Sequence, residues 1–204
     1  MIVKAARNLK LTVAYDGTNY HGFQDQARAD RPTVQRELET AWERLVGEHV
    51  KVIGAGRTDA GVHAEGQVVN FRTNSLAIPA ERVPHAMNSV LPPDVRVIDC
   101  AEVDLEFHAR FCAAAKQYVY RIDNRPVPSP LVRHFTHFVA RPLDIEAMNE
   151  AARHLVGRHD FRAFAGAGHA SRTTVRTLTR CDVSCEGGLV LITVEADAFL
   201  YHMV

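Results

Sequence analysis

Near its start, this chain spaces its apolar residues first as in a strand and then as in a helix. This order limits the folds that the chain can adopt. Apolar residues alternate along residues 9–15 (LKLTVAY), which is typical of a strand with one buried face. From residue 34 to residue 46 they recur at helical spacing, between the capping residue Thr33 and the helix-ending residue Gly47. A half-buried strand followed by a helix with one apolar stripe predicts a helix packed on a sheet.

The rest of the sequence repeats this combination of elements. We expect strands over residues 50–55, 67–72, 95–103, 116–122, 175–184 and 189–198. We expect helices over residues 79–91 and 145–156, the second capped by Asp144 and ended by Gly157. Glu186-Gly187-Gly188 is a hairpin signal. The order predicts the α+β class, with an N-terminal half at residues 1–106 and a similar C-terminal half at residues 107–204.

Composition excludes several classes of protein. Hydrophobic residues make up 47% of the 204 residues, too many for a disordered chain. The sequence lacks the run of about 18 apolar residues that a membrane-spanning helix needs, and its first ten residues do not resemble a signal peptide. The four irregularly spaced cysteines favour a reducing compartment, so we expect a cytoplasmic protein without membrane contact.

The formal net charge of zero conceals two basic segments. Residues 105–141 hold six basic and two acidic side chains, and residues 153–180 hold six arginines and one aspartate. Arginine suits phosphate contacts and base stacking. The segments are compatible with a face that binds nucleic acid. The alternative is a set of solvated arginines, and composition favours neither interpretation.

The densest group of polar residues is AGRTDAGVHAEGQ, at residues 55–67. Apolar residues precede and follow it, so Asp59 is expected on a loop between two core strands. The positive charge of Arg57, two residues away, would favour the ionised form of Asp59. An ionised, positioned carboxylate can serve as a nucleophile, a base or a ligand. The alternative is an aspartate that only caps the turn.

The sequence does not contain the common motifs of nucleotide-binding or metal-binding sites. Gly54-x-Gly56 lacks the third glycine of a dinucleotide fingerprint, and Gly56-x4-Gly61 lacks the Lys-Ser/Thr of a P-loop. The sequence has neither HExxH nor CxxC pairs, so we expect no metal site.

Tyr118 and Tyr120 share one face of a predicted strand. They are either core aromatics or rings that stack on an unpaired base.

Residues 55–69 (AGRTDAGVHAEGQVV) resemble the signature of the tRNA pseudouridine synthase A family. Further motifs similar to those of the family occur in its order: YDGTNYHGFQDQ at residues 15–26, TVQRELETA at 33–41, MNSVLPPDVRV at 87–97, FHARFCAAAKQYVYRI at 107–122, HDFRAF at 159–164, SRTTVRTL at 171–178 and ADAFLYHMV at 196–204. The resemblance spans almost the whole chain and argues against a merely turn-capping Asp59.

The resemblance implies an isomerase that converts uridine to pseudouridine at tRNA positions 38–40, in the anticodon stem-loop, as a homodimer without a cofactor. It implies the pseudouridine synthase fold, in which antiparallel sheets form a continuous sheet flanked by helices, with the active-site cleft between the halves. Carried over by matching residues, Asp59 is the catalytic nucleophile, Arg57 helps to flip the target base, and Tyr118 is the active-site tyrosine. We expect Arg57, Tyr118, His63 and Arg110 to contact the substrate.

This chain departs from the family pattern in three places. Phe23 stands where the family usually has Trp, and Asp25 stands where it often has a basic residue. The family continues after HMV with an arginine that is expected to pair with the catalytic aspartate, whereas this chain ends at Val204. We therefore expect a truncated chain, and a non-catalytic RNA-binding form is the alternative. A metal-dependent hydrolase that uses Asp59 and His63 is a third, weaker hypothesis, which predicts loss of activity on chelation.

Overall fold

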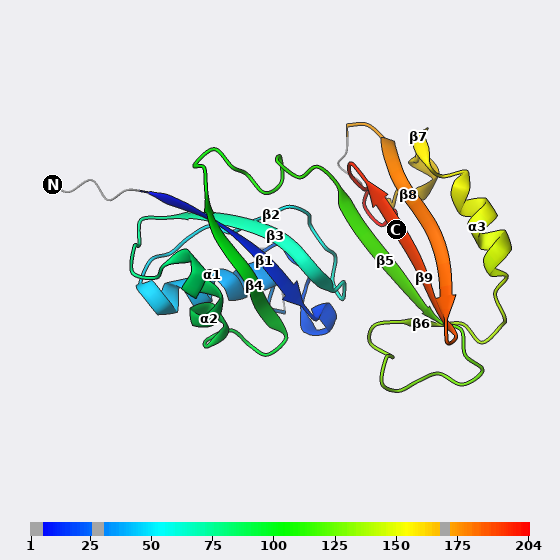
Figure 1. Ribbon diagram of the computed structural model, residues 1–204, viewed down its shortest axis with the longest axis horizontal. Coiled ribbons are helices and arrows are strands. Elements are labelled where there is room, and N and C mark those ends of the chain that lie inside the picture. The colour runs from blue at the N-terminus through cyan, green and yellow to red at the C-terminus, as the bar shows by residue number, and fades with distance from the viewer. Residues whose placement is uncertain (1–5, 26–30, 168–171) are drawn as a thin grey trace. The chain divides into compact units, whose positions relative to one another are not determined.

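The computed structural model describes residues 6–25, 31–167 and 172–204 (Figure 1). Two of the predicted motifs reach into Gln26 and Ser171, which lie outside the described residues. The contacts within the chain divide it into two units, Met1–Ala113 and Ala114–Val204. The sequence predicts a boundary after residue 106, and the contacts divide the chain after Ala113.

The first unit is built on a four-stranded antiparallel sheet. Its strand order is β2 (Ile53–Gly54), β3 (Ala64–Thr73), β1 (Arg7–Tyr15) and β4 (Val95–Val103). The alternation predicted for the first strand is confirmed, because every second side chain from Leu9 to Tyr15 is buried. The register of β1 against β3 shifts between Val13 and Tyr15, where β3 carries one extra residue between Ala64 and Gln67.

Helices α1 (Val34–Val46) and α2 (Val83–Asn88) pack with one face of this sheet into a common core (Figure 1). The predicted ends of α1 are confirmed: the Thr33 hydroxyl accepts a hydrogen bond from the Arg36 N–H, and Gly47 is left-handed at φ 70°. The Trp42 ring is fully buried, with its centroid 4.9 Å from that of Phe71. Two 3-10 helices, Gly17–Asn19 and Ala80–Arg82, also belong to the described part of this unit.

A pair of buried amides lies on the opposite face of the same sheet. The Asn8 side chain donates to the Asp104 and Phe107 carbonyls, both at 2.9 Å. The Asn70 side chain donates to Asn8 Oδ1 at 2.9 Å and accepts from the Ala109 N–H at 2.8 Å. These bonds attach residues 104–109 to the first sheet, which explains why the contacts divide the chain beyond residue 106.

The second unit is built on a five-stranded sheet. Its strand order is β6 (His137–Phe138), β5 (Lys116–Asp123), β9 (Leu189–Ala196), β8 (Val175–Glu186) and β7 (Gly157–Asp160). The predicted hairpin is confirmed, since Gly187 and Gly188 join β8 to β9 with φ values of 56° and 80°. The strand pairs of the described residues are antiparallel, as expected, except that the short strand β6 runs parallel to β5.

Helix α3 (Ile145–Arg153) packs against β8 (Figure 1). Its predicted cap is confirmed, because the Asp144 carboxylate accepts from the Ala147 N–H at 2.9 Å. The Asn149 side chain bonds both the N–H and the carbonyl of Val183, so α3 also covers part of the outer edge of β8. A 3-10 helix, Arg162–Phe164, follows β7.

Several predicted elements differ in length from those in the structure. The strand predicted over residues 50–55 is only Ile53–Gly54, because the Val52 N–H donates to the buried Glu39 carboxylate instead of a neighbouring strand. The helix predicted over residues 79–91 consists of a 3-10 turn and the short α2. The helix predicted over residues 145–156 ends at Arg153, and Gly157 begins β7 instead of stopping the helix.

The α+β class is confirmed by these two units, each with helices packed on a sheet. The strand pairs of the described residues form one sheet in each unit. The expected continuous sheet and the cleft between the halves both depend on how the units meet, so they stay predictions.

Candidate active site

Asp59 lies on the loop of residues 55–63, which joins β2 to β3 and which we call the aspartate loop. The side chains of Asp59 and Arg57 are exposed. The Val62 N–H donates to the Asp59 carbonyl at 3.2 Å, and Gly61 has φ 79°. This is the pattern of a type II turn, which needs glycine at its third position. The turn presents Asp59 at the surface of the first unit.

The first residues of the aspartate loop are held by β3. The Ala55 N–H donates to the Val68 carbonyl at 2.8 Å. The Gln67 side-chain amide donates to the Gly56 carbonyl at 2.6 Å. The loop therefore leaves the sheet in a fixed direction, although β2 itself is only two residues long.

Residues 16–23, which we call the strap, follow β1 and lie against the aspartate loop. The Phe23 N–H donates to the Thr58 carbonyl at 3.0 Å. A Cβ on Gly17 would lie 2.1 Å from the Val62 carbonyl oxygen, and a Cβ on Gly22 would lie 2.5 Å from that of Thr58. Glycine is therefore required at both positions, and the strap fixes the backbone on both sides of Asp59.

His63 ends the aspartate loop and contacts the strap. Its Nδ1 atom lies 3.1 Å from the Gly17 N–H and 3.0 Å from the Asp16 carboxylate. When Nδ1 carries no proton it accepts from Gly17, and when it is protonated it donates to Asp16. Partial burial would raise the pKa of Asp16, but hydrogen bonds from Thr18 and the charge of His63 outweigh burial and lower that pKa.

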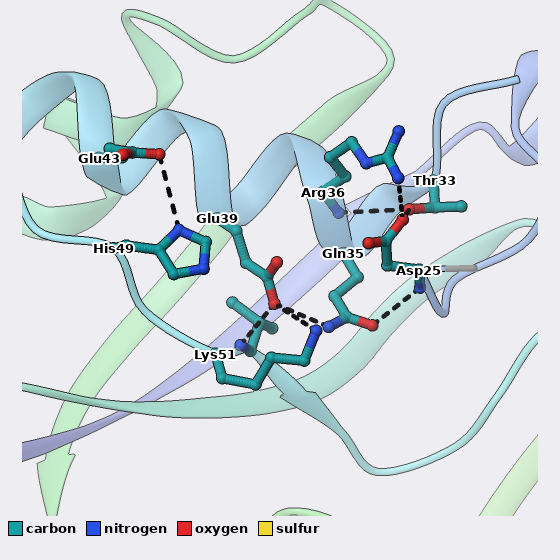
Figure 2. Close-up of polar contacts among 9 residues, drawn as sticks. Asp25, Thr33, Gln35, Arg36, Glu39, Glu43, His49 and Lys51 are labelled. Atoms are coloured by element: carbon teal, nitrogen blue, oxygen red, sulfur yellow. Dashed lines mark hydrogen bonds and ion pairs between the residues drawn. The ribbon is translucent and has the colours of Figure 1, made fainter. Parts of the chain in front are cut away.

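Helix α1 fixes the chain on either side of this site (Figure 2). The Asp25 N–H, just beyond the strap, donates to Gln35 Oε1 at 2.9 Å. The Gln35 side chain donates to Glu39 Oε1 at 2.7 Å, and the same oxygen accepts from the Val52 N–H at 2.9 Å. The Asp25 carboxylate also pairs with Arg36 at 2.7 Å. The acidic residue that departs from the family pattern thus has a partner within the fold.

Arg110 lies in the first unit and is exposed. It follows Ala109, which is buried and bonded to Asn70. Its guanidinium carbon lies 5.8 Å from the centroid of the Phe111 ring, within the range of a cation–π contact. Arg110 therefore projects from a segment that is anchored to the sheet.

Tyr118 lies on β5 in the second unit, where it pairs in register with Val194 of β9. Its side chain is half-buried, and its ring meets that of Phe199 edge to face, with 5.0 Å between the centroids. The structure thus brings Asp59, Arg57 and His63 together on one loop. It places Arg110 elsewhere in the same unit and Tyr118 in the other unit.

Sequence reasoning missed the residues that hold the aspartate loop. Tyr15 was predicted as part of a strand face, yet its hydroxyl lies 2.8 Å from that of Thr58. Gly17 and Gly22 fall between the strand predicted over residues 9–15 and the helix predicted over residues 34–46, where the sequence predicts neither element. The resemblance of residues 15–26 to a family motif is the signal that points to this segment, but it does not say what the segment contacts.

The comparison with protein families shows to which family the chain belongs. Residues 11–112 and 151–204 match the family model described as tRNA pseudouridine synthase. The chain belongs to the tRNA pseudouridine synthase family. The resemblance drawn from the motifs is confirmed, and so is the expectation of an isomerase family. Asp59, Arg57, His63 and Arg110 lie within the matched residues of this synthase family, and Tyr118 lies between the two matched stretches.

Curated relatives agree with the synthase family. The chain is 48% identical over 198 residues to the tRNA pseudouridine synthase A of Acetivibrio thermocellus, covering 97% of this chain and 80% of the relative. It is 49% identical over 196 residues to that of Moorella thermoacetica, covering 96% and 79%. It is 46% identical over 199 residues to the tRNA pseudouridine synthase A 2 of Clostridium tetani, covering 98% and 80%.

The sequence analysis also expects no membrane-spanning helix in this member of the synthase family. In the described part of the chain, none of them has the length and apolar character that crossing a membrane requires.

Proposed function

We propose that the chain isomerises uridine to pseudouridine at positions 38–40 of the tRNA anticodon stem-loop, with Asp59 as its catalytic carboxylate. The supporting observation is an exposed aspartate on a loop whose backbone is fixed on both sides, in a member of this family. A rigid backbone suits catalysis, because the reacting groups must be held close to the productive geometry.

The target uridine must first leave its stack. Flipping a base out costs a few kcal/mol, which contacts to the flipped nucleotide and to the vacated space must offset. Arg57 is exposed two residues before Asp59, so its guanidinium can enter the space that the base leaves. The basic segments at residues 105–141 and 153–180 would bind the surrounding phosphates.

Isomerisation then breaks the N1–C1′ bond, turns the uracil and forms a C5–C1′ bond, after which C5 loses its proton. Asp59 can attack C1′, attack the uracil ring or assist loss of a ribose proton, and each role requires its carboxylate. Tyr118 is proposed to stack on the uracil and to take the C5 proton. C5 gives its proton up to water and N1 takes one from water, so the product contains the same atoms as uridine.

His63 and Arg110 are proposed as further substrate contacts. Arg110 is exposed at the end of an anchored segment, which suits a phosphate contact. His63 is half-buried against the strap, so any contact with RNA would accompany its bonds to Gly17 and Asp16. We also propose that two copies of the chain form the working enzyme, which light scattering would test through the mass in solution.

The decisive experiment measures tritium release from unmodified tRNA that is labelled at uridine C5. We would compare the parent chain, Asp59→Asn and Asp99→Asn, a matched control because Asp99 is also exposed but lies on β4. We expect release by the parent and by the control. We expect a loss of at least about 10³-fold in Asp59→Asn, since the amide can neither attack nor accept a proton.

Each other outcome has a definite meaning. Equal release by Asp59→Asn would remove Asp59 from the mechanism. Binding of tRNA by the parent without release would favour the non-catalytic RNA-binding form. Loss of activity on addition of a chelator would favour the metal-dependent hydrolase, in which Asp59 and His63 hold an ion.

A further inference from the structure

The proposed function gives no role to Tyr15, although its hydroxyl reaches the residue that precedes Asp59. Tyr15 ends β1 and is 4% exposed. Its hydroxyl and that of Thr58 lie 2.8 Å apart and share one hydrogen bond. A tyrosine hydroxyl in an apolar core needs a polar partner. Here a partner is the side chain directly before Asp59, 43 residues away in sequence.

The surroundings of Tyr15 fix the position of its hydroxyl. The ring belongs to the core that β1 forms with α1, and its centroid lies 6.3 Å from that of Phe23. Tyr15 lies at a regular position of β1, because the extra residue of the register shift beside it lies on β3. The hydroxyl is therefore held by the sheet and the core rather than by the aspartate loop itself.

Thr58 is held from two sides by different parts of the chain. Tyr15 bonds its hydroxyl, and the Phe23 N–H bonds its carbonyl at 3.0 Å. Gly22 packs against the same carbonyl so closely that a Cβ there would lie 2.5 Å away. Of these contacts, the Tyr15 bond is the one that a single substitution can remove without altering the backbone.

We propose that Tyr15 is a positioning residue, which holds Asp59 in its reactive place through the hydroxyl of Thr58. The inference rests on the proposed function, in which Asp59 is the catalytic group. Small displacements of a catalytic group are costly, because a misplacement of about 1 Å can lower the rate about 100-fold. Loss of one bond on one side of Asp59 would loosen the loop without unfolding it.

Two substitutions isolate this hydrogen bond, and two more serve as controls. Tyr15→Phe and Thr58→Val each remove one hydroxyl, and Thr58→Ser keeps the hydroxyl at position 58. Thr73→Val makes the same change as Thr58→Val in a buried threonine that ends β3, whose hydroxyl donates to the Glu48 carboxylate and not to the aspartate loop or the strap. A general effect of removing a threonine hydroxyl would appear in both threonine-to-valine variants.

Tritium release under steady-state conditions gives the first readout. We expect Tyr15→Phe and Thr58→Val each to lower kcat about tenfold with KM within about twofold, and the double variant to lose no more than either single one. Thr58→Ser and Thr73→Val should keep kcat within about twofold of the parent. Equal losses in Thr58→Val and Thr73→Val, or fully additive losses in the double variant, would overturn the proposal.

Hydrogen–deuterium exchange gives a readout that does not need turnover. In Tyr15→Phe, amide exchange should speed up in residues 55–63 and stay unchanged in α1. Unchanged exchange in the aspartate loop would overturn the proposal, as would faster exchange with unaltered kcat. A parent chain without tritium release would refute the proposed function, and the exchange pattern would then decide by itself whether Tyr15 holds the loop.

Discussion

At Gly17, contact between two backbones leaves no room for a side chain. The strap touches the aspartate loop there, and an added Cβ would lie 2.1 Å from the Val62 carbonyl oxygen. Because this neighbour is backbone, it cannot turn away as a flexible side chain could. The same contact that fixes Asp59 therefore makes Gly17 intolerant of substitution.

We expect Gly17→Ala to lower the free energy of unfolding by about 1–3 kcal/mol, the usual cost of overpacking. Urea unfolding followed by the fluorescence of Trp42, the only tryptophan and a buried core residue, measures this change in the first unit. Gly66→Ala is the control, because a Cβ there meets only the Thr12 methyl group at 3.7 Å. Equal stability of both variants would contradict the close contact.

At the scale of elements, α1 connects the two segments that lead to the site (Figure 2). Glu39 is 6% exposed, and its Oε1 atom accepts from the Gln35 side chain and from the Val52 N–H, with Lys51 Nζ at 3.4 Å. Gln35 in turn bonds the Asp25 N–H beyond the strap. One helix face thus holds both the segment before the aspartate loop and the segment after the strap.

We expect Glu39→Ala to lower the free energy of unfolding by about 1–3 kcal/mol, because it leaves the buried Val52 N–H without this acceptor. Glu43→Ala, on the same helix, should change it by less than about 1 kcal/mol, since its exposed carboxylate pairs only loosely with His49 at 3.6 Å. Trp42 fluorescence in urea compares the two. A larger loss in Glu43→Ala than in Glu39→Ala would contradict the bridging role.

The elements also show what the sequence could predict. Both ends of α1 follow from residues within one turn of them, so Thr33 and Gly47 located them correctly. The apolar run at residues 50–55 indicated burial, which is right for Val50 and Val52, but a run of this kind cannot reveal strand pairing. The short strands β6 and β7 were missed because they are defined by partners far along the chain rather than by a pattern of their own.

In the candidate site, too, the sequence predicted the residues that a local motif carries and missed those that depend on distant contacts. Asp59 and Arg57 were found because a local motif carries them. Tyr15 and Gly17 were missed as residues that hold the site, because their importance arises from contacts with residues more than 40 positions away. The place of Tyr118 relative to Asp59 depends on two units whose residues pair separately, and it stays a prediction.

At the scale of the whole molecule, each unit has a hydrophobic core of its own. The first core contains the fully buried Trp42, Phe71 and Met87. Among the largest fully buried side chains of the described residues, Val190 is the member from the second unit. The second unit therefore gains less from burial of apolar surface than the first.

We expect the second unit to unfold at lower urea concentration than the first. Far-UV circular dichroism reports both units, whereas the fluorescence of Trp42 reports the first. The circular dichroism signal should therefore begin to fall before the fluorescence changes, which breaks two-state behaviour. Transitions that coincide by both probes would mean that the two cores unfold as one cooperative unit.

The central position of β1 has a consequence for the order of events during protein synthesis. This strand is made before the other described strands, yet it pairs with β3 and β4, the second of which ends only at Val103. The ribosome must therefore pass Val103 before the first sheet can close. By contrast, β8 and β9 are joined by two glycines and can pair as soon as they emerge. The first unit, which we expect to be the more stable one once folded, would then be the unit that depends on chaperones during translation.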